Sequence, residues 1–192
     1  MVEMLNKLSS VLEKINHPIL NRFEESEENK EIIDRFNNMK LDINDDLVNL
    51  YLWRGGINGA SVYDGSFVEL FSFGSYIDLS SAMSLLLLDR NSLKIYKGKL
   101  PFIQSTTGDT VSIDLSKNSA TKGMLLLFAP SITLSSDFVT LYDSVEKWLE
   151  TILECYHQKA YILDSNNFLE INFELENEIS KKINVNSDFW KG

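Results

Sequence analysis

Residues Thr110–Leu115 restrict the fold most, because apolar and polar side chains alternate along the whole segment. A period of two places successive side chains on opposite faces of a β-strand. The segment therefore predicts a strand with one face packed in a core and the other facing water or a partner. The apolar set is Val111, Ile113 and Leu115, and the polar set is Thr110, Ser112 and Asp114.

Three more segments of the middle third are expected to be extended. Residues 66–71 partly alternate around Glu69. Lys99–Gln104 contains Pro101, whose missing N–H suits the start or the edge of a strand. Met124–Phe128 is apolar throughout, which favours a strand in the interior of the sheet.

Helices are expected before these strands. Apolar residues recur every three or four positions from Met4 to Ile15, and Asn16-His17-Pro18 interrupts the pattern. Shorter helical patterns follow at 19–23 and 32–36. The acidic run between them, Glu24–Glu28, is expected to be a solvated face or a helix start.

The next helix has clear boundary signals. Asn44 is a good N-cap for it, and Asp45 and Asp46 suit the positive end of its dipole. Gly55-Gly56 is expected to end this helix, because glycine adopts positive φ without a steric cost. Asn58-Gly59 then predicts a tight turn into a strand. Asp78 or Ser80 is expected to cap a short helix that ends near Leu88.

The last third predicts helices again. Asp143 and Glu146 resemble a capping box, and apolar residues continue at helical spacing from Val145 to Tyr156. Residues 169–175 alternate as a strand does, whereas Leu175, Ile179 and Ile183 are spaced as in a helix. We expect a helix over 174–183.

The order of elements defines a fold class. Helices come first, then mostly consecutive strands, then helices, without the regular alternation of a parallel sheet. This order predicts an α+β fold. Residues 1–192 are expected to form one domain, because the length is ordinary for a domain and no linker rich in Pro, Gly or Ser occurs.

Charge bears on the kind of partner. The chain has 28 acidic and 18 basic residues, which gives a formal net charge of −10. Nucleic-acid binding draws on clustered Lys and Arg, so a nucleic-acid partner is not expected. A basic protein partner suits the charge better, although solubility alone also explains it.

Three observations indicate a cytoplasmic protein. Cys155 is the single cysteine, which excludes an internal disulfide and fits a reducing compartment. Residues 1–16 lack the apolar run of a secretory signal. The longest apolar runs, such as 85–88, are far shorter than the roughly 20 residues that span a bilayer. No membrane association is expected.

Catalytic residues are scarce. His17 and His157 are interpreted as capping or surface residues, and helical spacing points Cys155 and His157 in different directions. Asp78, Asp109 and Asp114 lack the spacing of a metal-binding loop. The motif Gly-Gly-Ile-Asn-Gly follows a helix, which is the reverse of a dinucleotide site. Neither an enzymatic activity nor a cofactor or metal is expected.

Short motifs occur in a fixed order between Leu20 and Trp190. They are a helix with Leu47, Leu50, Tyr51 and Trp53, the Asn58-Gly59 turn, Leu100-Pro101, Gly108-Asp109, Asp114-Leu115, Gly123 and a helix around Trp148-Leu149. This series resembles the SUKH superfamily, which includes bacterial immunity proteins and fungal regulators of cell-wall synthesis of the Smi/Knr type. The resemblance implies a curved, mainly antiparallel sheet backed by helices.

The same resemblance implies an immunity protein that binds and neutralises a bacterial toxin, often a nuclease. The alternatives are a regulatory scaffold with an endogenous partner, and a hydrolase if Glu69 and Asp114 meet in a closed apolar pocket. The helical pattern favours a core role for Trp53, with the floor of a binding cleft as the alternative. The residues expected to bind the partner are Trp53, Asn58, Asp64, Glu69, Asp109 and Asp114.

Overall fold

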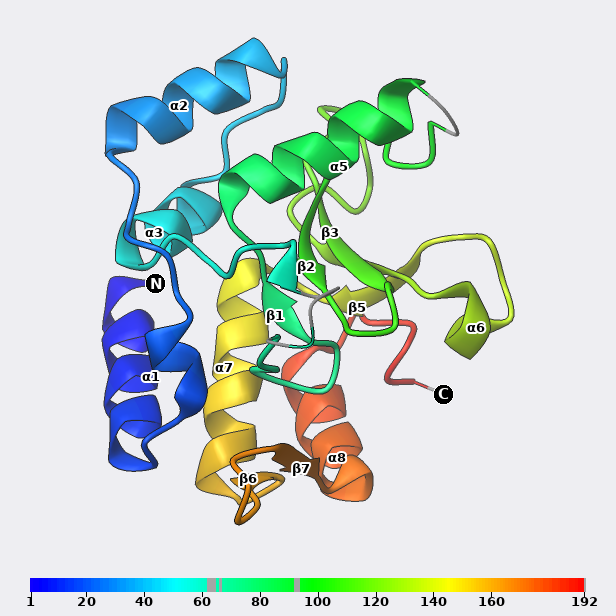
Figure 1. Cartoon of the computed structure of the whole chain (residues 1–192). Coiled ribbons are helices and arrows are strands. Elements are labelled where there is room, and N and C mark those ends of the chain that lie inside the picture. The colour runs from blue at the N-terminus through cyan, green and yellow to red at the C-terminus, as the bar shows by residue number, and fades with distance from the viewer. Residues whose placement is uncertain (62–64, 66, 92–93, 192) are drawn as a thin grey trace.

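The computed structural model describes residues 1–61, 65, 67–91 and 94–191 (Figure 1). The helices are α1 (Val2–Lys14), the 3-10 helix η1 (Pro18–Asn21), α2 (Asn29–Asn38), α3 (Asp45–Trp53), α5 (Leu79–Asn91), α6 (Pro130–Thr133), α7 (Val145–His157) and α8 (Phe173–Ile183). The strands are β1 (Ser75–Tyr76), β2 (Lys99–Gln104), β3 (Thr110–Asp114), β4 (Leu125–Phe128), β5 (Val139–Tyr142), β6 (Tyr161–Leu163) and β7 (Leu169–Ile171).

The main sheet has five strands in the order β1-β2-β3-β4-β5, and every neighbouring pair is antiparallel. β3 is its central strand, with Ile113 paired to Leu100 on β2 and to Leu125 on β4. β6 and β7 form a separate antiparallel pair. The predicted α+β class and antiparallel sheet are thus confirmed, and β4 is an interior strand as expected.

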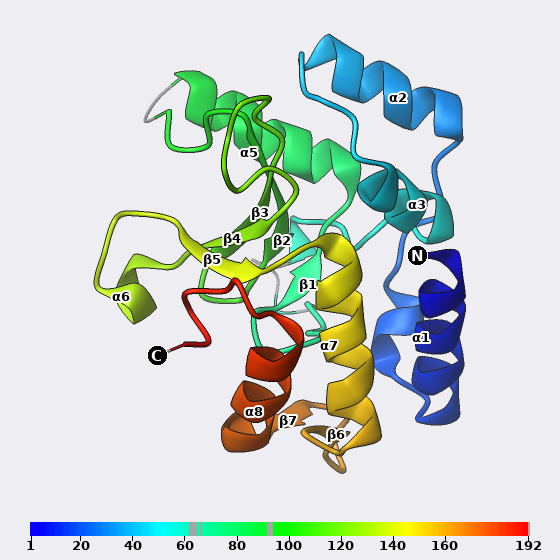
Figure 2. The same cartoon turned by 180° about the vertical axis from the view of Figure 1, so that it is seen from behind.

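Three helices, α1, α7 and α8, lie on one side of the sheet, and α5 packs against β2. Figure 1 shows α7 behind the sheet, with α1 and α8 on either side of it, and Figure 2 shows the same three helices in front. The indole of Trp148 on α7 is fully buried and meets Phe71, Tyr76 and Phe102 edge-on, with ring centroids 5.5, 6.3 and 5.9 Å away. Trp148 therefore joins α7 to the sheet, as its place in the apolar helical pattern predicts.

One cluster of buried apolar side chains extends from Leu5 in α1 to Trp190 near the end of the described chain. Burial of apolar surface is the main stabilising contribution to such a fold. None of the described helices is both long enough and apolar enough to cross a bilayer.

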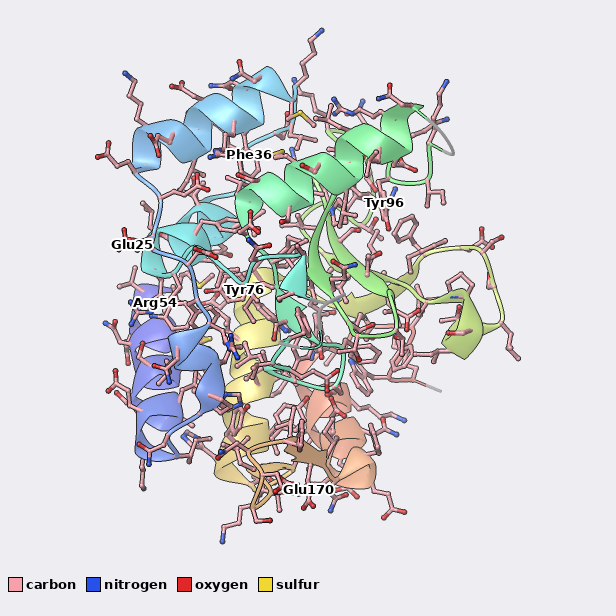
Figure 3. All side chains as sticks on the ribbon, in the orientation of Figure 1. Glu25, Phe36, Arg54, Tyr76, Tyr96 and Glu170 are labelled. Atoms are coloured by element: carbon pink, nitrogen blue, oxygen red, sulfur yellow. The ribbon has the colours of Figure 1, made fainter. Side chains whose placement is uncertain are left out.

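The expectation that the polar face of β3 meets water is wrong. Thr110, Ser112 and Asp114 are 4%, 0% and 1% exposed. Tyr96 covers one end of this face, where its hydroxyl lies 2.8 Å from Thr110 Oγ1 (Figure 3). Asp114 at the other end is enclosed by the loop of residues 115–123. Thr110 and Asp114 are buried because they hold loops onto the sheet, whereas the buried Ser112 hydroxyl has no hydrogen-bond partner in the described structure.

The expected strand at 66–71 is also wrong for its described residues 67–71. Phe71 makes only an isolated bridge to Gly74, and the strand β1 begins at Ser75. Gly74 has φ +104°, and a Cβ there would lie 2.0 Å from the Gln104 carbonyl oxygen. A close approach of two backbones at a glycine therefore decides where the sheet begins.

Contrary to expectation, the described residues that follow Asn58-Gly59 most closely, 60, 61 and 65, are not in a strand. The Asn58 side chain accepts from Ala60 N at 2.9 Å, and Gly59 N donates to Asp78 Oδ2 and to Ser81 Oγ, 3.2 Å from each. These side chains bind the amides of the turn, so the amides are not available to a β-ladder.

Some helix boundaries agree with those predicted from the sequence, and others differ. Asn44 caps α3 by accepting from Leu47 N at 2.9 Å, and Asp78 caps α5 by accepting from Ser81 N at 2.9 Å. α5 continues to Asn91, beyond the expected end. α7 is capped by Ser144 instead of Asp143, whose carboxylate accepts from Asn186.

α3 ends near the expected position for a different reason. Arg54 after it is extended, and only Gly56 has positive φ, at +87°. At the other end of the chain, both interpretations of the tail hold in part: 169–171 is the strand β7, and Phe173–Ile183 is the helix α8.

Candidate functional site

Of the six residues expected to bind a partner, the structure describes five and brings two of them together. Glu69 and Asp109 line the same cavity, whose volume is about 520 Å³. Asn58 is exposed elsewhere, in the turn described above. Asp64 lies outside the described residues.

Trp53 serves mainly as an anchor between helices. Its side chain is half-buried, and its ring packs against Phe23 and Tyr76, with centroids 5.5 and 6.4 Å away. Its indole N–H donates to Ser9 Oγ on α1 at 2.9 Å. Figure 3 places Tyr76 in the interior of the molecule. These contacts support a core role for Trp53, and the Ser9 hydroxyl accepts the hydrogen bond of its indole N–H.

Asp114 is a structural residue and not a surface contact, which corrects the sequence-based expectation. It accepts from Ser116 N at 2.9 Å, from Thr121 Oγ1 at 2.7 Å and from the Ser119 hydroxyl. Burial alone would raise the pKa of Asp114, but these hydrogen bonds outweigh it and lower the pKa. Asp114 therefore holds the β3–β4 loop closed.

The cavity is formed by segments distant in the sequence. Residues 69–73, the β2–β3 turn at 105–109, α6, the start of α8 and residues 189–190 all line it. Figures 1 and 2 show α6, α8 and the final described segment, residues 184–191, on the side of the molecule away from α1–α3.

Three aromatic rings form an apolar wall of the cavity. Phe73 lies edge-on to Phe189 and Trp190, with centroids 5.4 and 6.1 Å away. Phe189 and Trp190 are themselves nearly perpendicular, at 4.9 Å. Phe173 and Ile132, 68% and 52% exposed, line the same cavity and are open to solvent. The three rings therefore form a packed aromatic cluster whose remaining accessible surface lines the cavity.

Three carboxyl groups, those of Glu69, Asp109 and Glu176, line the cavity together with these rings. Glu69 accepts from Thr106 Oγ1 at 3.2 Å, and burial raises the pKa of Glu69 despite this hydrogen bond. Asp109 accepts from Thr107 Oγ1 at 2.6 Å. None of the described residues that line the cavity is Lys, Arg or His. The cavity thus has negative charge without a cation of its own.

Glu176 on α8 is the deepest of the three carboxyl groups, with 1% of its surface exposed. The hydroxyls of Ser72 and Tyr161 both donate to Glu176 Oε1. Burial raises the pKa of Glu176, although both hydrogen bonds act in the opposite direction. Ionisation of Glu176 in the folded protein therefore costs free energy.

Two other candidate chemical groups, His17 and Cys155, are buried, whereas His157 is exposed. His17 Nδ1 accepts from Ile19 N at 3.1 Å, and burial lowers the pKa of His17 to about 4. His17 is thus a capping residue as expected, but not a surface one. Burial raises the pKa of the Cys155 thiol to about 12, so this thiol is a poor nucleophile. No group of three or more His, Cys, Asp or Glu in the described ranges is placed to hold a metal ion.

A scan against protein-family models found no match to this sequence, and comparison with curated proteins found none either. The relationship to the SUKH superfamily therefore stays a prediction from the short motifs.

Sequence reasoning missed Glu176 and the three aromatic rings. Glu176 belongs to a residue type that is almost never fully buried without a partner, and Phe73 is more than 100 residues from Phe189. The adjacent pair Phe189-Trp190 was the one available signal, because two large aromatic residues in a polar tail indicate an anchor.

Proposed function

We propose that the protein binds a basic protein partner with the face that contains the cavity, and that it acts as an immunity protein that neutralises a bacterial toxin. The observation that carries the binding proposal is the cavity itself, with Glu69, Asp109 and Glu176 and no basic residue among its described lining. The toxin as partner follows from the resemblance to SUKH immunity proteins.

The negative charge of the protein gives a physical mechanism for binding and blocking a basic partner. A net charge of −10 attracts a basic domain and speeds encounter, while carboxylates on the contact face take the place of phosphates in a nuclease groove. The exposed Phe173 and Ile132 supply apolar area beside these carboxylates. Such a combination suits a protein interface, in which a few buried anchors provide most of the binding energy.

A regulatory scaffold that binds an endogenous basic partner through the same face is the alternative within this class. The adjacent reading frame separates the two: a large secreted protein with a variable C-terminal domain supports the toxin proposal. Its absence favours the scaffold.

A hydrolase is the second candidate, and a different pair of carboxyl groups favours it. Glu69 and Asp114 do not meet, but Glu69 and Glu176 line one cavity and both have raised pKa values. A raised carboxyl pKa is typical of a general acid. If Glu69→Gln and Glu176→Gln each abolish protection of cells while association with the toxin persists, catalysis is the better explanation.

The decisive experiment measures association with the C-terminal domain of the neighbouring secreted protein. The double variant Glu69→Lys/Asp109→Lys should associate at least tenfold more slowly at low salt and show weaker salt dependence. Its thermal stability should change little, because exposed or half-exposed charges contribute roughly 0–1 kcal/mol.

Glu31→Lys/Asp34→Lys is the matched control, with the same charge change on two exposed positions of α2. Equal association rates for the parent and the cavity variant would contradict the proposed face. Slower association of the control alone would place the interface on the acidic segment at α2.

A further inference from the structure

The aromatic wall and the carboxyl groups of the cavity favour different chemical groups in a bound ligand. Aromatic faces attract cations and planar groups, and carboxylates accept hydrogen bonds from cationic donors. A lysine ammonium binds the carboxylates as a point charge. A guanidinium binds both the carboxylates and the aromatic rings, because it is planar, stacks on rings and offers N–H donors in a fixed fork.

We propose that the cavity receives an arginine side chain of the protein partner. The planar guanidinium packs on the wall of Phe73, Phe189 and Trp190, and its N–H groups bind the carboxylates of Glu69 and Glu176. This inference rests on the proposed function, since it names the group by which the basic partner is recognised.

The size of the cavity fits such an occupant. Ligand pockets usually have volumes of roughly 300–1,000 Å³. A volume of about 520 Å³ holds one long side chain and part of the backbone that carries it. The exposed Phe173 and Ile132 then contact the aliphatic stem or an apolar neighbour of the arginine.

Unbalanced charge favours a cationic occupant. Glu176 is buried with only neutral donors, Ser72 and Tyr161, on its carboxylate. A guanidinium in the cavity supplies the missing positive charge where screening by water is weak. It also brings more donors than the two hydroxyls, and Glu176 Oε2 and the Glu69 carboxylate can accept them.

The test titrates the full chain with three capped peptides: acetyl-Gly-Arg-Gly-amide, the same peptide with Lys, and the same peptide with citrulline. Citrulline keeps the shape of arginine and removes its charge. The readout is the two-dimensional ¹H–¹⁵N spectrum, in which the Trp190 indole signal is identified by its loss in Trp190→Phe. That indole N–H is buried and makes no hydrogen bond within the described structure, and Trp190 lines the cavity, so its signal reports a change in the surroundings of the ring when an occupant binds.

We expect a saturable shift of the Trp190 signal with the arginine peptide, with a Kd on the order of 1 mM for a single side chain. The lysine peptide should bind at least fivefold more weakly, and the citrulline peptide should produce no saturable shift. Glu176→Gln and Glu69→Gln should each weaken arginine binding at least tenfold. Glu31→Gln on α2 should leave it unchanged.

Equal binding of arginine and citrulline, or no shift at Trp190, would overturn the inference. Equal binding of lysine would overturn the role of the aromatic wall. If Glu176→Gln does not fold, Glu69→Gln on the more open side still decides the role of the carboxylates. Toxin neutralisation without arginine binding refutes this inference alone, whereas arginine binding without any association with the toxin refutes the proposed function alone.

Discussion

Thr140 on β5 and Asp188 in the final segment bond to each other twice. Thr140 Oγ1 donates to Asp188 Oδ2 at 2.9 Å and accepts from Asp188 N at 2.8 Å. The Thr140 carbonyl also accepts from the Ser187 hydroxyl and from Phe189 N. These bonds hold the segment that places Phe189 and Trp190 in the cavity wall.

Thr140→Val should therefore loosen the final segment. Loss of the hydroxyl removes both hydrogen bonds to Asp188. Because Asp188 is exposed and water can replace part of them, the free energy of unfolding should fall by about 0.5–1.5 kcal/mol. Tryptophan fluorescence should shift to longer wavelength as Trp190 gains water. Thr133→Val is the control, because the Thr133 hydroxyl bonds only within and next to the short helix α6. Similar urea midpoints and spectra for both variants would refute this role.

Trp148→Ala tests the junction between α7 and the sheet. Removing a fully buried indole that contacts three aromatic rings should cost about 3–5 kcal/mol, measured by urea unfolding. Phe168→Ala is the control, because Phe168 is 71% exposed and its loss should change stability by less than about 0.5 kcal/mol. A cost below about 1 kcal/mol for Trp148→Ala would mean that the ring does not anchor the helix.

Asp114→Asn tests how the β3–β4 loop is held. The amide places a donor among three donors, so we expect a loss of about 1–3 kcal/mol at pH 7. The pKa of Asp114 is lowered in the folded state, so its contribution is present above the unfolded value of 3.8 and is lost as pH falls through the folded pKa. Parent and variant should therefore approach equal stability in acid. A stability difference that does not depend on pH would refute the carboxylate's role.

Glu176→Gln should change the pH dependence of stability in the opposite sense. Burial raises the pKa of Glu176, so its favourable contribution is present below the unfolded value of 4.5 and is lost as pH rises through the folded pKa. Tyr161, Tyr142, Cys155 and Ser72 face this carboxyl group, and all are uncharged at neutral pH. The variant should lose less stability between pH 5 and 8 than the parent does.

Glu178→Gln on the same helix is the control, because Glu178 is exposed. Thermal unfolding at several pH values measures all three proteins. A Glu176→Gln curve that is parallel to the parent's would show that Glu176 does not titrate in this range.

Gly74→Ala should be among the most damaging single substitutions. The φ of +104° is strained for alanine, and the added Cβ would lie 2.0 Å from the Gln104 carbonyl oxygen. Gly123→Ala has a similar φ of +83° but nothing within 4 Å of its Cβ. Backbone strain alone should cost Gly123→Ala about 1–2 kcal/mol, so a larger loss for Gly74→Ala isolates the steric clash. Equal losses in urea unfolding would refute a clash.

Local signals were enough to predict much of the fold. The N-cap at Asn44, the extended segment Lys99–Gln104 and the apolar helical pattern of α7 each depend on neighbouring residues, and each is confirmed. β1 was missed because its start is determined by contact between Gly74 and Gln104, which are 30 positions apart. β5 and β6 were not predicted.

The cavity was harder to predict than the fold. Alternation in β3 indicates two faces, but it does not say whether a loop covers the polar one, and here residues 115–123 do. Glu69 and Asp109 were chosen for their charge and turn positions, and the structure brings them to one cavity. Glu176 was missed because Ser72 and Tyr161 stabilise its buried carboxyl group from distant segments.

The composite wall of the cavity has a consequence for protein synthesis. Translation adds roughly 5–20 residues per second and delivers residues 69–73 well before Phe189 and Trp190. Until Trp190 has left the ribosome, the nascent chain has the carboxyl groups but only part of the aromatic wall. The protein therefore acquires this binding capacity only once Trp190 has emerged, and not as each earlier lining segment is made.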